Sequence, residues 1–419
     1  MRENLDRAMA QAVETLEQWK GRTVRLFHHK DADGLSSGAI LSRAMTRAGF
    51  DVARTCLEKP YPPVIQTIFR DAARIIIFAD FAGRIAPLLA RANRGRNLVL
   101  ILDHHPAVAS DDPFVLNLDP HLFGFRGDRD VSASTVCFRF AERLDPANRD
   151  LAYLAVTGAV GDGFFQDGRL TGLNRLAAEA AVALGQLEIT ARPDGEAYRL
   201  CGPVHALAVD ALAEDLDLLG GMGFFQEGPE AGIRVCLKGY DAAAKRLRDR
   251  LTRRRLGLFA AERDALRAGA LKFSKGVQWF GVGNRFDGTG VKTIGTFCAQ
   301  LRGEEFIDPD KYLAGFQPVP NRVPGLGRID FNAVKVSMRV PPALEARIEK
   351  GQMPGLDRLL PEATRAAGGF SDACHSLAAA TTIPPGAEKK LIAAMDALLQ
   401  ASCDPGAFLP QYPPLKPRA

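Results

Sequence analysis

The pattern of hydrophobic and polar positions divides the first third of the chain into short apolar runs separated by segments of helical spacing. The apolar runs are of strand length and rich in Val, Ile, Leu and Phe, and they cover residues 23–28, 51–57, 74–79, 97–102 and 114–117. Runs of this kind, alternating with helices, are typical of parallel strands buried on both faces. The pattern therefore predicts an α/β fold whose N-terminal part is a mainly parallel sheet covered by helices on both faces.

The remainder of the chain predicts a helical region and a second, smaller unit. Helical patterns over 134–144 and 150–160 follow the sheet, and the alternation stops between about 196 and 270. Strand-like runs return at 277–282 and 333–340, with helical segments after them. We expect an N-terminal domain, a helical linker region, a smaller C-terminal α/β domain facing the first across a cleft, and a tail, over residues 1–195, 196–270, 271–405 and 406–419.

The composition argues against a membrane protein and against a zinc ribbon. Of the 419 residues 25% are charged and 47% hydrophobic, and no apolar run approaches the roughly 18 residues that a membrane span needs. The charged N-terminal stretch lacks the form of a signal peptide, so we expect a cytoplasmic protein. The seven cysteines never have Cys-x-x-Cys spacing, which favours reduced thiols. A net charge of +5 is compatible with a polyanionic partner.

Acidic and imidazole side chains follow three of the predicted strands, directly after each strand ends. They are His29, Asp31 and Asp33 after the first strand, whose last residue is His28, Asp80 after the third, and Asp103, His104 and His105 after the fourth. By itself each motif also occurs in calcium loops, plain turns or helix caps. Because the carboxyl ends of parallel strands meet at one edge of a sheet, we expect these side chains to converge there. Carboxylates and imidazoles together predict a metal centre.

Two helices are expected to border this edge. The first covers residues 35–48, with Ser36 and Ser37 near its start, where we expect them to cap the helix rather than to act in catalysis, and Gly49 just past its end. The second, over 150–160, is followed by Asp162. A carboxylate at a helix C-terminus opposes the helix dipole, so a bound cation would compensate the charge of Asp162.

In order and approximate spacing, these motifs resemble the four motifs of the DHH phosphoesterase family. The resemblance depends on Asp31-Ala32-Asp33-Gly34, Asp80, Asp103-His104-His105 and Gly161-Asp162. The family includes the exonuclease RecJ, archaeal single-strand nucleases, nanoRNA and cyclic-dinucleotide phosphodiesterases and, more distantly, family II pyrophosphatases. The form His29-x-Asp31-x-Asp33-Gly34 is most similar to the archaeal RecJ-like branch.

The resemblance implies a centre of two metal ions, Mn²⁺ by preference and Mg²⁺ as a substitute. The ligand sets that it implies are His29, Asp31 and Asp80 for one ion and Asp33, Asp80, His104 and Asp162 for the other, with Asp80 shared. Asp103 is a further residue of ligand type, and His105 would contact the scissile phosphate or orient a ligand. From spacing alone, either His28 or His29 could be the ligand.

The C-terminal part resembles the DHH-associated domain of the same family. Lys335-Val336-Ser337-Met338-Arg339 is similar to its Ser-x-Arg strand, and the stretch from Gly368 to Ala380 is similar to its glycine-rich loop around a histidine. The resemblance implies that Ser337, Arg339, Gly369 and His375 bind a substrate phosphate, with Arg339 using its planar fork. The loop departs from the family because Ser371-Asp372-Ala373-Cys374 replace glycines, so we expect an altered or weaker phosphate grip.

The function that the resemblance implies is Mn²⁺-dependent hydrolysis of single-stranded DNA or RNA from an end. The alternatives are hydrolysis of very short oligonucleotides, cyclic dinucleotides or another small phosphoester or phosphoanhydride, and a catalytically silent replication scaffold. A silent protein would have lost metal ligands, whereas every expected ligand type is present here. The sequence makes no prediction of the oligomeric state.

Basic residues crowd one helical segment of the expected linker. Between residues 241 and 256 the only acidic residues are Asp241 and Asp249, and the basic ones are Lys245, Arg246, Arg248, Arg250, Arg253, Arg254 and Arg255. One interpretation is a solvated linker helix. The other is a surface that follows a nucleic-acid backbone, whose binding would depend on salt.

Overall fold

The computed structural model describes residues 1–70 and 74–402, and the chain divides into two compact units. The first unit comprises Met1–Arg253 and two short returns of the chain, Gly288–Gly290 and Arg322–Asp330. The second comprises Arg254–Asp287, Val291–Asn321 and the residues from Phe331 onward. This division places residues 196–253, which were expected in a linker, with the first unit. The expected tail over 406–419 lies outside the described residues.

The first unit is built on a parallel sheet of five strands. In spatial order they are β2 (Asp51–Cys56), β1 (Thr23–His28), β3 (Ile75–Ala79), β4 (Leu98–Leu102) and β5 (Val115–Asn117), and all neighbouring pairs are parallel. Every residue of β3 and β4 is buried, as the continuous apolar runs require of strands covered on both faces. The predicted parallel sheet is therefore confirmed.

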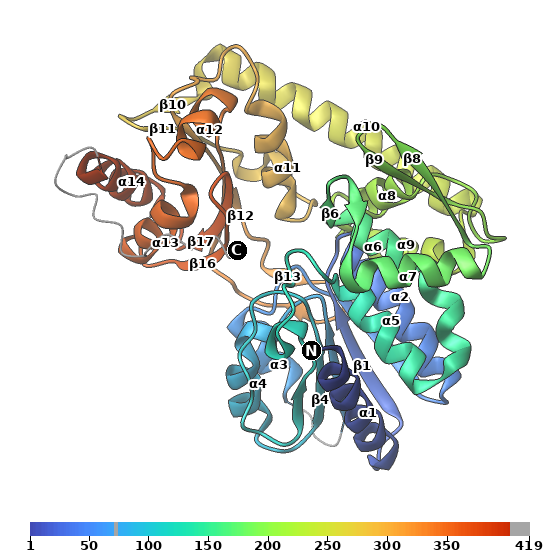
Figure 1. Ribbon diagram of the computed structural model, residues 1–419. Coiled ribbons are helices and arrows are strands. Elements are labelled where there is room, and N and C mark those ends of the chain that lie inside the picture. The colour runs from blue at the N-terminus through green and yellow to red at the C-terminus, as the bar shows by residue number, and fades with distance from the viewer. Residues whose placement is uncertain (71–73, 403–419) are drawn as a thin grey trace, which may run out of the picture. The chain divides into compact units, whose positions relative to one another are not determined.

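Helices cover both faces of this sheet (Figure 1). On one side lie α3 (Pro62–Ile68) and α4 (Ala86–Asn93), and on the other lie α1 (Arg2–Gln18), α2 (Ala32–Arg47) and α5 (Ala133–Leu144). α6 (Ala152–Gly161) packs against α2 and α5 and is buried from Ala152 to Ala159, as a helix that is apolar on all sides should be. The prediction of helices on both faces is confirmed.

The start of α2 differs from the prediction. The helix begins at Ala32, and its N-cap residue is Asp31, whose side chain accepts a hydrogen bond from the Gly34 amide. Ser36 and Ser37 lie inside the helix and are fully buried, so the predicted capping role of the two serines is wrong. The apolar periodicity starts only after the Asp-x-Asp-Gly motif, which explains why it placed the helix start too late.

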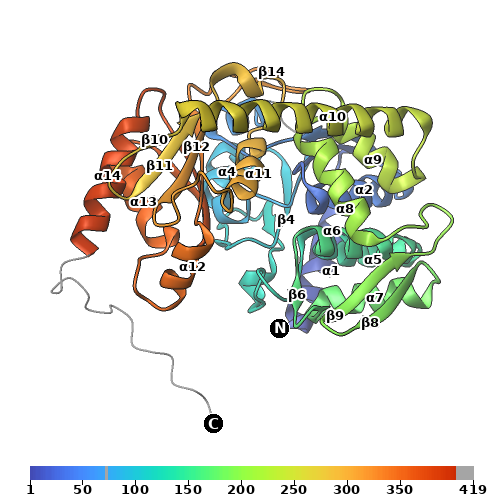
Figure 2. The ribbon, with the colours of Figure 1, turned by 90° about the horizontal axis from the view of Figure 1, so that it is seen from above.

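Two small hairpins and further helices complete the first unit. The elements are β6 (Phe165–Gln166), β7 (Arg169–Leu170), α7 (Gly172–Ala183), β8 (Leu187–Arg192), β9 (Gly195–Leu200), α8 (Val209–Gly221) and α9 (Gly228–Lys238), followed by α10 (Ala242–Ala265). β8 and β9 pair antiparallel in a hairpin that the periodicity did not predict. α10 is one continuous helix, longer than the predicted 241–256, and its residues belong partly to each unit (Figure 2).

The second unit has a mixed sheet of its own. Its spatial order is β10 (Lys272–Phe273), β11 (Val277–Gly281), β12 (Tyr312–Pro318), β15 (Val334–Arg339), β17 (Ala378–Ile383) and β16 (Phe370–Cys374), in which only β11 and β12 pair parallel. Its helices are α11 (Lys292–Leu301), α12 (Pro342–Glu349), α13 (Leu356–Ala366) and α14 (Glu388–Ser402). The short hairpin of β13 (Arg322–Val323) and β14 (Gly327–Arg328) lies in the segment that clusters with the first unit.

Two apolar clusters form the core of this second unit. Tyr312 and Val336 are fully buried with the inner residues of α13 and α14, while Phe280, Phe297 and Leu313 are buried in a cluster that includes α11. A smaller α/β unit is thus confirmed. In the described part of the chain, no helix combines the length and apolarity that crossing a bilayer requires.

Candidate metal centre

The carboxyl ends of β1, β3 and β4 are level with one another. The strand register aligns His28 with Ala79 and Ala79 with Leu102, so the residues that follow the three strands emerge at the same edge of the sheet. β2 lies on one side of β1 and β3 on the other, so the strand order reverses between β1 and β3. Open α/β sheets bind their ligands outside the strand ends at such a reversal.

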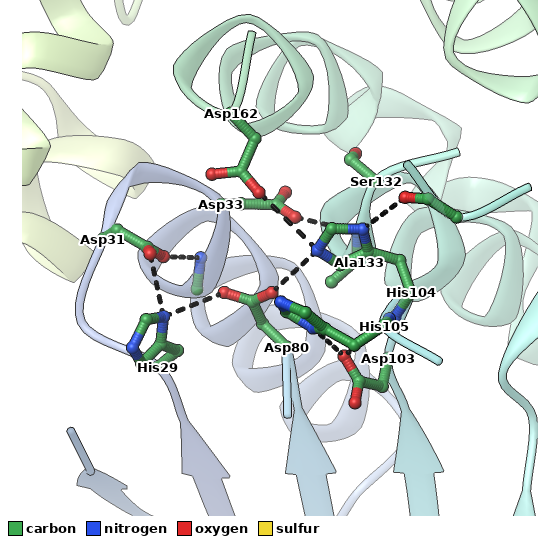
Figure 3. Close-up of polar contacts among 12 residues, drawn as sticks. His29, Asp31, Asp33, Asp80, Asp103, His104, His105, Ser132, Ala133 and Asp162 are labelled. Carbon is green, nitrogen blue, oxygen red and sulfur yellow. Dashed lines mark hydrogen bonds and ion pairs between the residues drawn. The ribbon is translucent and has the colours of Figure 1, made fainter. Parts of the chain in front are cut away.

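Asp80, which follows β3, lies at the middle of a cluster of acidic and imidazole side chains (Figure 3). Its Oδ2 is 3.3 Å from Nδ1 of His29, and its Oδ1 is 3.5 Å from Nε2 of His104. The same nitrogen of His29 is 2.8 Å from Oδ2 of Asp31, and Nε2 of His104 is 3.5 Å from Oδ2 of Asp162. Asp80 is thus shared by two groups of side chains, one on each side of it.

Three sets of side chains bring potential ligand atoms within 4.8 Å of one another in the described residues. The sets are His29, Asp31 and Asp80; Asp33, Asp80, His104 and Asp162; and Asp80, Asp103, His104 and His105. The first two have the same members as the two ligand sets that the family resemblance implies. Asp80 belongs to all three sets.

Asp33 is fixed by the start of a neighbouring helix. Its carboxylate is fully buried and accepts hydrogen bonds from the amides of Ala133 (2.8 Å) and Ser134 (2.9 Å), in the first turn of α5. Gly158 of α6 packs against the same carboxylate, because a Cβ at Gly158 would lie 2.2 Å from Asp33 Oδ1. α5 and α6 together therefore set the position of Asp33.

Asp103 holds the loop that carries the two histidines. Its Oδ1 accepts hydrogen bonds from the amide of His104 (2.8 Å) and from Nδ1 of His105 (2.8 Å), and its Oδ2 accepts one from the amide of Gly83 (2.9 Å). The side chain of His105 is 49% exposed, whereas that of Asp103 is 1% exposed. Asp103 thus orients His105, which is the more accessible of the two.

Of the two adjacent histidines, His29 is the one whose ring lies among the carboxylates. His28 is fully buried, its Nδ1 lies 2.8 Å from the carbonyl oxygen of His29, and its ring packs against Gly38. Burial lowers the pKa of His28 to about 4. The geometry therefore favours His29 over His28 as a metal ligand.

The cluster concentrates negative charge in a buried place. Burial, followed by repulsion from the carboxylates of Asp31, Asp33, Asp162 and Asp103, raises the pKa of Asp80 well above its usual value. Burial also raises the pKa of Asp33. Burial alone would lower the pKa of His104, but the neighbouring carboxylates, Asp162 foremost, raise it. A cation in the cluster would relieve this repulsion.

Unsatisfied polar atoms in the cluster also fit a bound cation. Asp80 Oδ1 and His104 Nε2 are buried without a hydrogen-bond partner among the described residues, whereas buried polar atoms nearly always have one. The other ring nitrogen of His104 lies 2.6 Å from the carbonyl oxygen of Gly127, which fixes the ring so that Nε2 faces Asp80 and Asp162. The donor set of carboxylate oxygens and imidazole nitrogens suits Mn²⁺.

In the second unit, two of the predicted phosphate-binding residues lie together on β15. Ser337 is buried and Arg339 half-buried, and a Cβ added to Gly295 of α11 would lie 3.2 Å from Ser337 Oγ and 3.3 Å from Arg339 Nη2. One guanidinium nitrogen of Arg339 donates to the carbonyl oxygen of Met338 (2.8 Å). Ser337 and Arg339 thus face the same glycine of α11.

The other two predicted residues flank β16. His375 is exposed, and its amide donates to the carbonyl oxygen of Ala378, which is aligned with Arg339 in the neighbouring strand. Gly369 precedes β16, and a Cβ there would lie 2.4 Å from the Thr382 carbonyl oxygen, so packing accounts for this glycine. The side chain of Asp372, which was expected to alter the phosphate grip, lies outside the described residues.

Sequence reasoning did not identify three residues that support the cluster. Asp217 of α8 accepts a hydrogen bond from the amide of Ala32 (2.9 Å), and Gly127 supplies the carbonyl oxygen next to His104. Asp119 is buried, and burial followed by the charge of Asp103 raises its pKa to about 8. Neither Asp217 nor Gly127 follows a predicted strand, so the pattern of strands gave no signal for them. Asp119 stands two residues after the predicted strand 114–117, so the rule that pointed to Asp80 could have found it.

The chain has one sequence relative among the curated proteins at a significant level, and no protein-family model matches it. The relative is an uncharacterized protein of Methanocaldococcus jannaschii, 33% identical over 165 residues. The matched segment is 38% of this chain and 36% of that protein.

Solved structures share the fold. RecJ of Thermus thermophilus in complex with Mn²⁺ has a TM-score of 0.61 at 17% identity over 94% of this chain and 55% of its own. Exonuclease RecJ bound to manganese has a TM-score of 0.57 at 18% identity over 94% of each chain. The DHH domain of a protein assigned to a family of ribosomal proteins has a TM-score of 0.61 at 14% identity over 94% and 91%. At these identities the likeness shows the fold, and the RecJ-like DHH fold expected from the motifs is confirmed.

Proposed function

We propose that this protein is a metal-dependent phosphodiesterase that removes nucleotides from an end of single-stranded DNA or RNA. The observation that carries the proposal is the position of Asp80 between two sets of metal-ligand side chains at the strand ends. A carboxylate shared in this way is what a pair of divalent ions needs, and paired ions are a common device for cleaving phosphoesters. The RecJ structures that share the fold contain Mn²⁺, which supports the choice of ion.

The side chains that would hold the ions are those of the two sets that meet at Asp80. One ion would be held by His29, Asp31 and Asp80, and the other by Asp33, Asp80, His104 and Asp162. When bound, Mn²⁺, or Mg²⁺ as a substitute, supplies Lewis-acid stabilisation of the charge that develops on a phosphoryl group and activates water. The amides of α5 hold the Asp33 carboxylate in place for this role.

His105 is the residue of the cluster best placed to meet a substrate phosphate. It is half-exposed, and Asp103 accepts a hydrogen bond from its Nδ1, so its Nε2 is left to contact a phosphate oxygen. In the second unit, Arg339, Ser337, His375 and Gly369 are proposed to bind a phosphate that is not cleaved. These assignments follow the family resemblance, and the altered loop before His375 is expected to weaken the grip.

The basic side chains of α10 favour a polymeric substrate over a small one. Some of the seven are engaged: Arg248 pairs with Asp215 and Asp249, and Arg254 donates to the carbonyl oxygen of Asp287. Others are exposed and form no ion pair with a described residue, namely Lys245, Arg246, Arg250 and Arg253. The last three are spaced by four and three residues, which places them on one face of the helix.

A length series of 5′-labelled oligonucleotides in Mn²⁺ tests the proposal. We expect shortening of single strands of tens of bases by the wild type and loss of turnover in Asp80→Asn. Asp194→Asn, a substitution of an exposed carboxylate in the turn between β8 and β9 and outside every ligand set, is the matched control and should keep wild-type turnover.

The outcome of this series also separates the alternatives. Activity confined to oligonucleotides of two to four residues, or to cyclic dinucleotides, would contradict the exonuclease proposal and favour a phosphodiesterase of small substrates. Equal turnover by wild type and Asp80→Asn would show that the cluster is not the active site. No turnover of any of these substrates, with Mn²⁺ bound in calorimetry, would favour the silent scaffold.

A further inference from the structure

A cavity lies in the first unit, apart from the carboxylate cluster. Its volume is about 320 Å³, which is within the range of pockets that hold small molecules. The C-terminal end of α2, the start of α6, the loop after β9 and the end of α9 bound it. Nothing in the proposed phosphodiesterase chemistry uses this cavity.

The cavity and the metal centre lie at opposite ends of the same two helices. α2 begins beside Asp33 and reaches the cavity with Arg43, ten residues later, which is about 15 Å along the helix axis. α6 starts at the cavity with Tyr153 and is followed by Asp162 in the cluster. The cavity is therefore a separate site and not an extension of the metal centre.

Arg43 gives the cavity an available positive charge. Its side chain is half-buried and lines the cavity, and it forms no hydrogen bond or ion pair with any residue that the structure describes. Arg47, one turn later, is engaged, because its two terminal nitrogens lie 2.7 and 2.6 Å from the carboxylate oxygens of Asp150. The guanidinium of Arg43 can therefore bind an anionic group of a ligand in its planar fork.

Gln186 gives the cavity a hydrogen-bond acceptor. Its Nε2 donates to the carbonyl oxygen of Asp150 (2.7 Å), and because that carbonyl only accepts, the orientation of the Gln186 amide is fixed. Its Oε1 is buried and has no donor among the described residues. An unpaired buried acceptor is unfavourable, and a ligand N–H or O–H would satisfy it.

Aromatic and aliphatic side chains form the rest of the wall. Tyr153 and His205 have ring centroids 6.0 Å apart, and the Tyr153 hydroxyl donates to the carbonyl oxygen of Cys236 (2.8 Å). Burial lowers the pKa of His205, so its ring is neutral at neutral pH. Leu200 and Leu237 add aliphatic surface. The wall therefore presents ring and aliphatic surface to the body of a ligand.

We propose that this cavity binds a small anion whose body is an aromatic ring bearing an N–H or O–H donor. The anionic group pairs with Arg43, the donor reaches Oε1 of Gln186, and the ring packs against Tyr153 and His205. Two kinds of molecule share this chemistry: nucleoside monophosphates, whose bases carry amino or imino groups, and aromatic carboxylates that contain a ring N–H. The inference does not depend on the proposed phosphodiesterase activity.

Isothermal titration of the full chain tests the site, with EDTA present so that divalent ions do not bring phosphate to the metal centre. AMP, GMP and UMP form one arm, and indole-3-acetate forms the second. Inorganic phosphate is the control for an anion that lacks an aromatic ring. We expect saturable 1:1 binding in at least one of the first two arms. Arg43→Gln should weaken it about tenfold or more, as loss of a charged hydrogen bond does. Arg143→Gln, which removes an exposed guanidinium of α5 elsewhere, should leave it unchanged.

A second variant keeps the test informative if one substitution perturbs the fold. Gln186→Leu removes the acceptor and should also weaken binding, and circular dichroism of each variant checks that the chain is folded. Three results would overturn the inference: no saturable binding in either organic arm, equal binding by wild type and folded Arg43→Gln, or phosphate alone binding as tightly as the aromatic anions.

Discussion

Gly158→Ala tests whether the close packing of α6 sets the position of Asp33. A Cβ at Gly158 would lie 2.2 Å from Asp33 Oδ1 and 2.2 Å from Ser134 Oγ, and ordinary contacts of a Cβ begin at 3.4 Å. The atoms must therefore separate by about 1.2 Å, which is 3.4 minus 2.2. Asp33 and Ser134 are both fully buried and hydrogen-bonded to their surroundings, so the strain moves the carboxylate or the helix.

The magnitude of the effect follows from that displacement. Misplacing a catalytic group by about 1 Å lowers a rate by roughly 100-fold, so we expect a loss of that order in turnover. The change in the free energy of unfolding is smaller. Overpacking destabilises the protein by about 1–3 kcal/mol, whereas alanine in place of glycine inside a helix stabilises it by up to about 1 kcal/mol. Activity should therefore fall much more than the free energy of unfolding.

Two measurements and one control decide the point. Calorimetry gives the affinity for Mn²⁺, and the length series gives the turnover of single-stranded oligonucleotides. Gly257→Ala is the control, since Gly257 also lies inside a helix, α10, but a Cβ there would meet no atom within 4 Å. If Gly158→Ala binds Mn²⁺ and turns over within threefold of the wild type, the packing of α6 does not set the position of Asp33.

Three further predictions concern charge. Asp80→Asn should raise the free energy of unfolding in EDTA, because burial and four neighbouring carboxylates oppose ionisation of Asp80. The substitution should also remove the stabilisation of the folded protein by Mn²⁺. Thermal unfolding with EDTA and with Mn²⁺ measures both effects, and a Tm that Mn²⁺ still raises in the variant would contradict the assignment of Asp80 as a ligand. Burial lowers the pKa of His205 from 6.5, so below that pH the unfolded chain binds a proton that the native protein does not, and stability falls. Urea unfolding between about pH 7.5 and 5.5 should show a steeper loss in wild type than in His205→Gln, and equal slopes would refute this. Replacing Arg246, Arg250 and Arg253 by Gln should lower the slope of log affinity for single-stranded DNA against log salt by about 2, at about 0.7 per phosphate contact; an unchanged slope in filter binding would exclude this face of α10.

The apolar runs predicted the first sheet well because its strands are buried on both faces. β1 and β4, for example, lie within a residue of the predicted bounds. The sequence also placed the acidic and imidazole residues at one edge, because a parallel sheet presents all of its carboxyl ends on the same side. The helix start at Ala32 was missed because Asp31 caps the helix from within a motif that has no apolar periodicity.

The supporting residues could not be read from the sequence because their roles depend on long-range packing. The amides that bind Asp33 belong to residues 133 and 134, about a hundred positions away, and no local pattern marks them. The same is true of the Gly127 carbonyl oxygen beside His104, which lies in a loop between strand and helix. The β8–β9 hairpin was missed because most residues of β8 are exposed and the buried residues of β9 do not alternate strictly with exposed ones.

The energetics of the cluster support the proposed binding of cations over a cluster without function. Gathering the carboxylates of Asp31, Asp33, Asp80 and Asp162 around one buried place is unfavourable in the absence of a cation, as the raised pKa of Asp80 shows. A protein that used the fold only as a scaffold would gain stability by replacing any of these residues with a neutral one. Sites that retain such destabilising arrangements are typically functional ones. The buried and unsatisfied Oδ1 of Asp80 is therefore best explained by a cation that binds there. The gain in stability and the loss of turnover expected for Asp80→Asn have the same cause, because the negative charge that destabilises the cation-free protein is the charge that binds the cation.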